Sequence, residues 1–136
     1  MHQDEVLADV LRFFENREPE LALYRRLEAE ICARFPVQRI RVQQTQIAFW
    51  ASHPIAIVSL RRARGWPDHC ITVTFGLDHR LDSARIAQAV EPYPNRWTHH
   101  VAVSRPEQID DELLGWIGEA HRFSESKRKS SPPCKI

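Results

Sequence analysis

The spacing of apolar residues changes at Pro36 from helical to alternating, and this change constrains the fold more than any other feature of the sequence. Before Pro36, apolar side chains recur every three or four residues, which predicts helices over residues 4–16 and 19–35. Pro19 suits the first turn of the second helix, and Pro36 ends it. After Pro36, polar and apolar residues alternate, so a sheet follows the helical pair.

Four short strands are predicted after this point, over residues 39–42, 45–51, 55–60 and 70–75. The tight link at residues 52–54 indicates a hairpin, so neighbouring strands should be mostly antiparallel. The segment LDSARIAQAV at 81–90 has helical spacing, with Asp82 or Ser83 suited to its N-cap, and predicts a third helix. Residues 97–104 alternate as a fifth strand, and an amphipathic helix follows over about 109–123.

The predicted element order is α-α-β-β-β-β-α-β-α, which is typical of an α+β fold. We expect an antiparallel sheet of about five strands with helices packed on one face. A length of 136 residues fits one domain, which we assign to residues 1–123. The segment SESKRKSSPPCKI at 124–136 has no apolar periodicity and is predicted to be a disordered polar tail.

The three cysteines have no CxxC spacing, and two of them lie in apolar segments, where a free thiol behaves as a small hydrophobic group. A reducing, cytoplasmic location is therefore expected. The first ten residues carry acids where a signal peptide carries positive charge, and no apolar run has membrane-spanning length. We expect no membrane association.

Residues that could carry chemistry are poorly paired. The chain has only four glycines, so neither a phosphate-binding loop nor a dinucleotide fingerprint can be written. Of the seven histidines, His99 and His100 are adjacent and would point to opposite faces of a strand, so they cannot share a metal ion. No nucleophile motif is present. The sequence predicts no catalytic residue, no metal site, no cofactor and no enzyme activity.

Two groups of residues are candidate binding surfaces. All but three of the nineteen basic residues are arginines, which bind phosphates and carboxylates with a planar fork, although genomic bias toward arginine explains the same count. The first group could surround one sheet edge and comprises Arg39, Arg41, Arg61, Arg62 and Arg64 with Trp66. The second belongs to the run EPYPNRWTHHV and comprises Arg96, Trp97, His99 and His100. The alternatives are a solvated strand with an exposed loop, and a turn whose Trp97 and His99 pack inward.

The stretch LDSARIAQAVEPYPNRWTHHVAV, with DDELLGWIGEAHRF after it, closely resembles a small uncharacterised bacterial domain-of-unknown-function family. Its signature reads LDSxRI, EPYPxRWTHHV and DDELLxW, and its members are sometimes labelled predicted transport protein. The resemblance covers roughly residues 19–123. It implies no activity and no catalytic residue.

Three hypotheses about function follow. A non-enzymatic binding or interaction domain with a protein or small-molecule partner comes first, because a well-patterned core without paired chemistry leaves the surface as the functional part. A nucleic-acid-binding accessory domain comes second and requires the arginines to form one basic face. A small enzyme or ligand-binding protein comes third and requires a pocket that joins His99 or His100 to a carboxylate. A homodimer is compatible with each.

Overall fold

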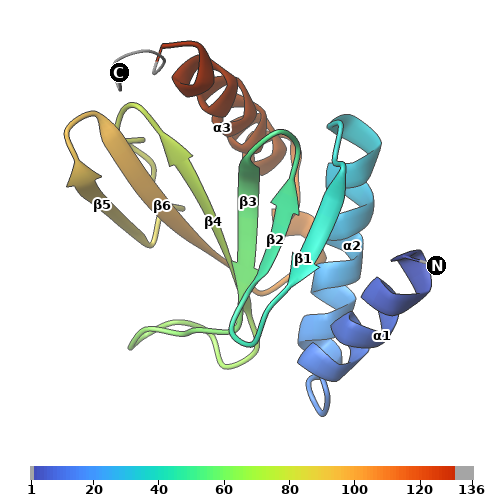
Figure 1. Cartoon of the computed structure of the whole chain (residues 1–136). Helices are drawn as coiled ribbons and strands as arrows, with labels where there is room; N and C mark the ends of the chain where they lie inside the picture. The colour runs from blue at the N-terminus through green and yellow to red at the C-terminus, as the bar shows by residue number, and fades with distance from the viewer. Residues whose placement is uncertain (1, 131–136) are drawn as a thin grey trace.

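Six antiparallel strands form one sheet in the part of the chain described by the computed structural model, which covers residues 2–130 and the side chains of residues 5–126 (Figure 1). The helices are α1 (His2–Phe13), α2 (Glu18–Arg34) and α3 (Asp111–Ser130), with a 3-10 turn, η1 (Pro106–Gln108), before α3. The strands are β1 (Arg39–Val42), β2 (Ile47–Trp50), β3 (Pro54–Ser59), β4 (Ile71–Leu77), β5 (Gln88–Tyr93) and β6 (Arg96–Val103). The spatial order is β1-β2-β3-β4-β6-β5. The predicted α+β class with an antiparallel sheet is confirmed.

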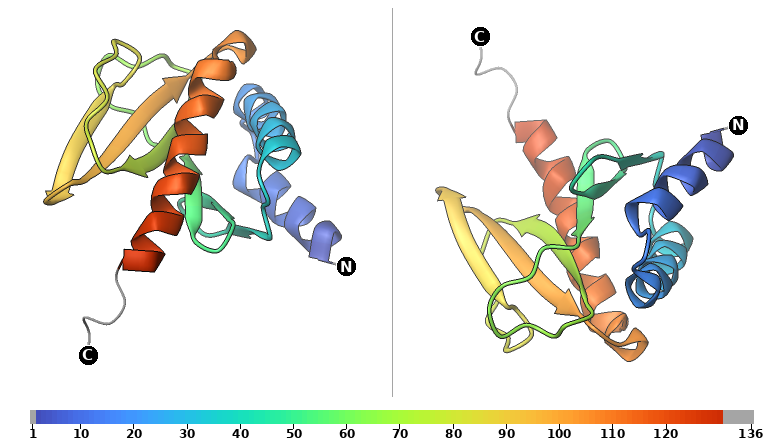
Figure 2. Two further views of the ribbon diagram at one scale, coloured as in Figure 1. Left: turned by 90° about the horizontal axis from the view of Figure 1, so that it is seen from above. Right: turned by 90° about the horizontal axis from the view of Figure 1, so that it is seen from below.

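The helical pair at the start of the chain forms where the apolar spacing predicts it. Asn16 ends the first helical segment with a φ of 62°, a left-handed conformation that asparagine tolerates better than most residues. Pro19 lies in the first turn of α2, where its missing amide costs no helical hydrogen bond. Figure 2 shows α1 and α2 together near the β1 end of the sheet, while α3 crosses β3 and β4.

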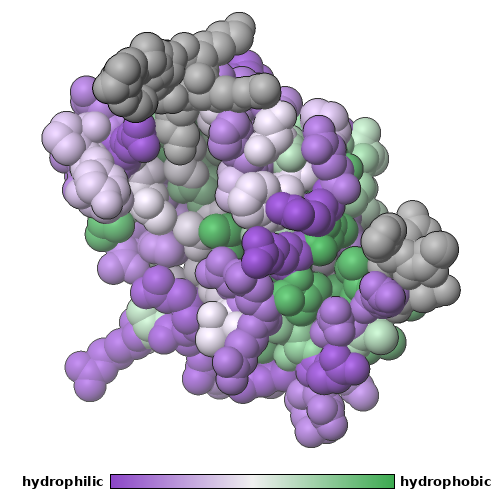
Figure 3. All heavy atoms as spheres, in the orientation of Figure 1, coloured by the Kyte–Doolittle hydropathy of each residue, from purple (hydrophilic) through white to green (hydrophobic). Residues whose placement is uncertain are grey.

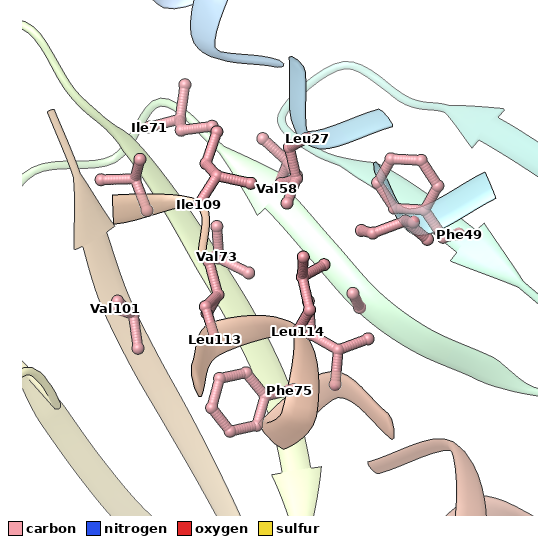
Figure 4. Packing of buried hydrophobic residues seen from close by; sticks show 14 of the residues in the cluster. Leu27, Phe49, Val58, Ile71, Val73, Phe75, Val101, Ile109, Leu113 and Leu114 are labelled. Atoms are coloured by element: carbon pink, nitrogen blue, oxygen red, sulfur yellow. The ribbon is translucent and has the colours of Figure 1, made fainter. Parts of the chain in front are cut away.

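One face of the sheet supplies the core. Val73 at the centre of β4 pairs with Val58 on one side and Val101 on the other, so these three side chains point the same way. They pack against Leu113 and Leu114 of α3 (Figure 4). The same cluster includes residues of α1 and α2, so all three helices cover one face, as the sequence predicts.

The helix predicted over residues 81–90 is wrong. In the structure, residues 81–87 form turns and irregular backbone, and β5 begins at Gln88. β5 pairs with β6 through a hairpin whose turn places Asn95 at a φ of 62°. The helical spacing that includes Val90 is overridden by this pairing, because a strand beside β6 satisfies backbone groups and two following prolines cannot continue a helix. Val90 is 42% exposed.

Arg85 fastens this irregular segment to the start of α3. Its guanidinium donates to both carboxylate oxygens of Asp110 at 2.9 and 3.0 Å, to Glu112 at 2.9 Å and to the Gln108 carbonyl at 2.7 Å. Asp110 also accepts a hydrogen bond from the Leu113 amide, as an N-cap does. Burial opposes ionisation of Asp110, but these bonds outweigh it and lower its pKa.

We expect Arg85→Ala to lower the free energy of unfolding by about 2 kcal/mol, within the range for hydrogen bonds to charged groups. Arg85→Lys should recover little, because an ammonium cannot reproduce the planar fork that reaches several acceptors at once. Urea unfolding of both variants checks this. Recovery of full stability by lysine would show that only the charge matters.

The domain boundary expected at Phe123 falls inside α3, which continues to Ser130. Ser124 is 4% exposed, and its hydroxyl donates to the His121 carbonyl at 2.8 Å. Residues 124–130 of the predicted tail are therefore helical rather than disordered, because the backbone of α3 continues through them. The remainder of that tail, 131–136, lies outside the described residues. Within the described part, no helix combines the length and hydropathy needed to cross a membrane.

Candidate functional site

The face of the sheet opposite the helices carries the candidate site, and we call it the open face. One register row crosses all six strands and consists of Arg41, Ala48, Ile57, Thr74, His100 and Gln88. Strand alternation places Arg39, Trp50 and Arg96 on the same side. Figure 3 views the molecule with β3 in front of α3, and hydrophilic residues there surround a smaller apolar area. The open face is thus arginine-rich at its margins and weakly polar at its centre.

Arginines of the open face lack the carboxylate partners that several helix arginines have. Arg12 lies 2.9 Å from Asp9, and Arg26 lies 3.5 Å from Glu30, although Arg25 and Arg122 on the helices have no such partner among the described side chains. Among the side chains that the structure describes, no carboxylate pairs with the following arginines of the sheet and its β3–β4 loop: Arg39, Arg41, Arg61, Arg64 and Arg96.

Acidic residues are also scarce in the sheet itself. The only acidic residue in the six strands is Glu91, and its carboxylate accepts a hydrogen bond from the Asn95 amide in the β5–β6 turn. Glu91 therefore serves the turn. Arginines without carboxylate partners next to a face without carboxylates create a positive potential there.

The predicted arginine group is divided by the fold. Arg39 and Arg41 lie on β1, at one edge of the sheet, and Arg39 stacks over the Trp50 ring at 4.9 Å. Arg61 follows β3 and reaches across to Gln88 of β5, at the other edge, with Nη2 at 3.4 Å from Oε1. The two edges are roughly 24 Å apart, because the six strands of the sheet are separated by five of the usual strand spacings. The arginines bracket the open face and do not form one patch.

The remaining members of the predicted loop group differ from one another. Arg62 folds back on its own loop, donating to Asp68 at 3.2 Å and to the Pro67 and Asp68 carbonyls at 3.3 and 3.0 Å. Arg64 is exposed, and Trp66 is only half-buried. Arg62 shapes the loop, and this leaves Arg61 and Arg64 as the loop cations available to a partner.

His99 and His100 point to opposite faces, as their adjacency predicts. His99 is fully buried on the helix side, stacks on Phe75 at 5.3 Å and accepts a hydrogen bond from the Leu81 amide at Nε2. Its predicted binding role does not fit this position. Burial, together with the nearby His79, lowers its pKa. Because Nε2 accepts from the Leu81 amide, it carries no hydrogen, and the neutral ring has its proton on Nδ1.

His100 lies on the open face, where its side chain is 9% exposed. Its Nδ1 lies 2.8 Å from the Thr74 hydroxyl across the β4–β6 pair. Burial and the Arg61 charge lower the pKa of His100. Of the two predicted histidines, only His100 can meet a partner on this face.

Trp97 and Arg96 also separate. Trp97 pairs with Leu77 and so points to the helix side at the end of β6, half-buried, with Arg80 over its ring at 6.0 Å. Arg96 is exposed at the start of β6. The EPYPNRWTHHV run therefore contributes Arg96 and His100 to the open face, while Trp97 and His99 face the helices.

The open-face residues that were not predicted as site residues include Trp50, Thr74 and Gln88. Trp50 and Thr74 lie in correctly predicted strands, and strand alternation alone would place them opposite the core residues Phe49 and Val73. Gln88 could not be found, because its segment was predicted to be helical. The sequence shows by alternation that Trp50 and Thr74 lie on the face opposite the core. It does not show that the helices leave this face uncovered.

A hollow of about 370 Å³ lies between the end of β4 and α3, and its lining includes Asp78, His79, Glu119 and Arg122. Neither His99 nor His100 lines it. His79 Nδ1 lies 2.7 Å from Asp78, and its Nε2 lies 3.8 Å from Glu119. Across the described residues, no group of three potential ligands is placed to hold a metal ion.

Comparison with protein-family models identifies the family of this chain. The model of the family described as Domain of unknown function (DUF5655) matches residues 12–124, most of the chain. No curated protein and no solved structure gives a match. The resemblance inferred from the LDSxRI, EPYPxRWTHHV and DDELLxW segments is confirmed as that of an uncharacterised domain family. The chain therefore belongs to the domain-of-unknown-function family DUF5655.

Proposed function

We propose that this chain is a non-enzymatic binding domain and that its open face binds an anionic partner. The observation that carries the proposal is that arginines around this face lack carboxylate partners among the described side chains. The row of paired residues that crosses the six strands on this face also contains no aspartate or glutamate. A phosphate or carboxylate on the partner would supply the missing charge, in hydrogen bonds about twice as strong as neutral ones.

The shape of the sheet also favours binding at this face. The row of residues from Arg41 to Gln88 that crosses the open face, which we call the central row, is held rigidly because each inner strand is paired on both sides. Ala48 in this row is only 4% exposed. Such a row needs little ordering when a partner docks, so less of the interaction free energy is lost to entropy. The arginines at the edges of the open face would then orient the partner across the strands.

The test removes the positive charges of the open face and compares the result with an equal loss elsewhere. In the triple variant Arg39→Ala, Arg41→Ala, Arg61→Ala, we expect retention on heparin at low salt to be almost lost. For a single-stranded nucleic acid, the dependence of log K on log salt should flatten by about 0.7 for each phosphate contact removed.

The matched control is Arg12→Ala, Arg26→Ala, Arg34→Ala, which removes three arginines that already have carboxylate partners on the helices. This control should keep most of the retention, because exposed paired charges add little to the field on the far side of the sheet. Equal losses in both triple variants would mean that net charge, rather than the open face, governs binding.

A single-stranded nucleic acid is a second candidate partner, favoured by the Arg39 guanidinium stacked on Trp50. Bases stack on aromatic rings and on guanidinium planes, each with about 1–3 kcal/mol per base. We expect oligothymidylate to quench tryptophan fluorescence, and Trp50→Phe to remove most of that change. Quenching that persists in Trp50→Phe would assign the signal to one of the other tryptophans and count against this candidate.

A further inference from the structure

Three polar side chains from three separate segments converge at one end of the central row. Gln88 of β5 and His100 of β6 are directly paired, and the backbone beside them is fixed by a 2.9 Å bond from the Ala87 amide to the His100 carbonyl. Arg61 reaches them from the β3–β4 loop through its 3.4 Å contact with Gln88. The Arg61 backbone is anchored as well, because its carbonyl accepts a 2.8 Å hydrogen bond from the Thr72 hydroxyl.

The contacts inside this group determine which atoms remain for a ligand. Gln88 uses its oxygen to accept from Arg61, so its amide NH₂ is left as a donor. His100 contacts the Thr74 hydroxyl through Nδ1, so Nε2 is the ring nitrogen that this contact leaves for a ligand. With Arg61 included, the group offers three kinds of N–H donor when the Thr74 hydroxyl donates to Nδ1 or when His100 is protonated, since Nε2 then carries a hydrogen. Among the described side chains, Arg61 has no carboxylate to neutralise it.

We propose that Arg61, Gln88 and His100 form a binding site for the phosphate group of a small phosphomonoester. This inference rests on the proposed function, since it names one anionic group and its place on the open face. A phosphomonoester has three terminal oxygens for the three donors, whereas a phosphodiester has only two. The guanidinium supplies the charge, the amide and the imidazole fix the orientation, and Thr74 holds the ring.

The site predicts a coupling between anion binding and protonation of His100. The side chains that face this ring are Thr74 from β4, Gln88 from β5 and Arg61 from the loop, and Arg61 is the charged group that lowers its pKa. A bound phosphate would cancel the field of Arg61 and accept from protonated Nε2. Proton and phosphate should therefore each favour binding of the other by the same factor.

The experiment follows the ring signals of His100 by NMR during pH titration of the full chain, with inorganic phosphate or with sodium chloride at equal ionic strength. We expect phosphate to raise the titration midpoint of His100 by about half a pH unit, which corresponds to roughly threefold tighter phosphate binding by the protonated ring. Arg61→Gln should abolish this difference. Arg26→Gln, on α2 beside Glu30, should leave it intact.

Several outcomes overturn the site. They are an unchanged midpoint in phosphate, a change that chloride reproduces, and an equal effect of Arg61→Gln and Arg26→Gln. A response to oligothymidylate without a response to inorganic phosphate also overturns it, in favour of a phosphodiester at this face. If the phosphate response is absent while heparin retention still depends on Arg39 and Arg41, the site fails and the proposed function stands. If the phosphate response occurs without any heparin retention, the site stands and the broader binding face fails.

Discussion

Replacing Trp116 with alanine should lower the free energy of unfolding by about 3–5 kcal/mol, the usual cost of emptying a large buried aromatic site. Trp116 is 8% exposed on α3, lies 6.1 Å from the Phe75 ring of β4, and is covered by the Arg85 guanidinium at 5.7 Å. Its removal leaves a cavity where α3 meets the sheet and uncovers Arg85. Chemical denaturation followed by circular dichroism measures the effect.

Trp97→Ala is the matched control, because it removes the same side chain from the end of β6, where the indole is half-buried. We expect about 1 kcal/mol, near the centre of measured values for point mutants. The alternation of residues 97–104 alone would place Trp97 fully in the core and give it the larger cost. Equal costs for the two variants would show that Trp97 packs more completely than its exposure indicates.

The sequence predicts most of the fold because the hydrophobic period is a local signal. The two helices before Pro36, the first four strands and the apolar face of α3 all follow from spacing within a few residues. The prediction for the β5 segment fails because the conformation of these residues depends on a strand that is distant in the sequence. Residues 81–90 are compatible with a helix, and only the open edge of β6 makes a strand the better state.

The candidate site was harder to predict than the fold, since it depends on which face the helices leave open and on contacts between distant segments. Arg61 and Gln88 are 27 residues apart and meet only because the sheet order places β6 and β5 beyond β4. Alternation shows that Arg41 and His100 lie on strand faces, but it does not show that these faces coincide. The register supplies that step.

The recognisable segments of the family have mainly structural roles in this chain. Arg85 of LDSARI contacts Asp110 and Glu112 of DDELL, and it covers Trp116 at the end of the same motif. Two of the three signature segments thus meet in one ion-paired cluster. In the third, Glu91 holds the turn. Arg96 and His100 of this third segment lie on the open face, and His100 is directly paired with Gln88.

The stability of the protein should fall as the pH is lowered from 6.5 to 5. Burial lowers the pKa of His99 and of His100 in the folded chain, whereas in the unfolded chain both should titrate near 6.5. Above about pH 6.5 both states are neutral, and no stability is lost. Below about pH 6.5 the unfolded state binds protons on these histidines and the folded state does not. Each histidine therefore lowers the free energy of unfolding by up to about 1.4 kcal/mol per pH unit until the pH reaches its pKa in the folded chain.

Urea unfolding of the parent chain, His99→Gln and His100→Gln at several pH values between 5 and 7.5 isolates these contributions. Each variant should show a shallower loss of stability below pH 6.5 than the parent, whatever its absolute stability. Comparison of slopes also cancels Glu28, whose pKa burial raises and whose contribution has the opposite sign. A slope unchanged in His99→Gln would mean that the imidazole stacked on Phe75 takes up its proton at the same pH in the folded and the unfolded chain, and this would contradict its place in the core beside the Leu81 amide.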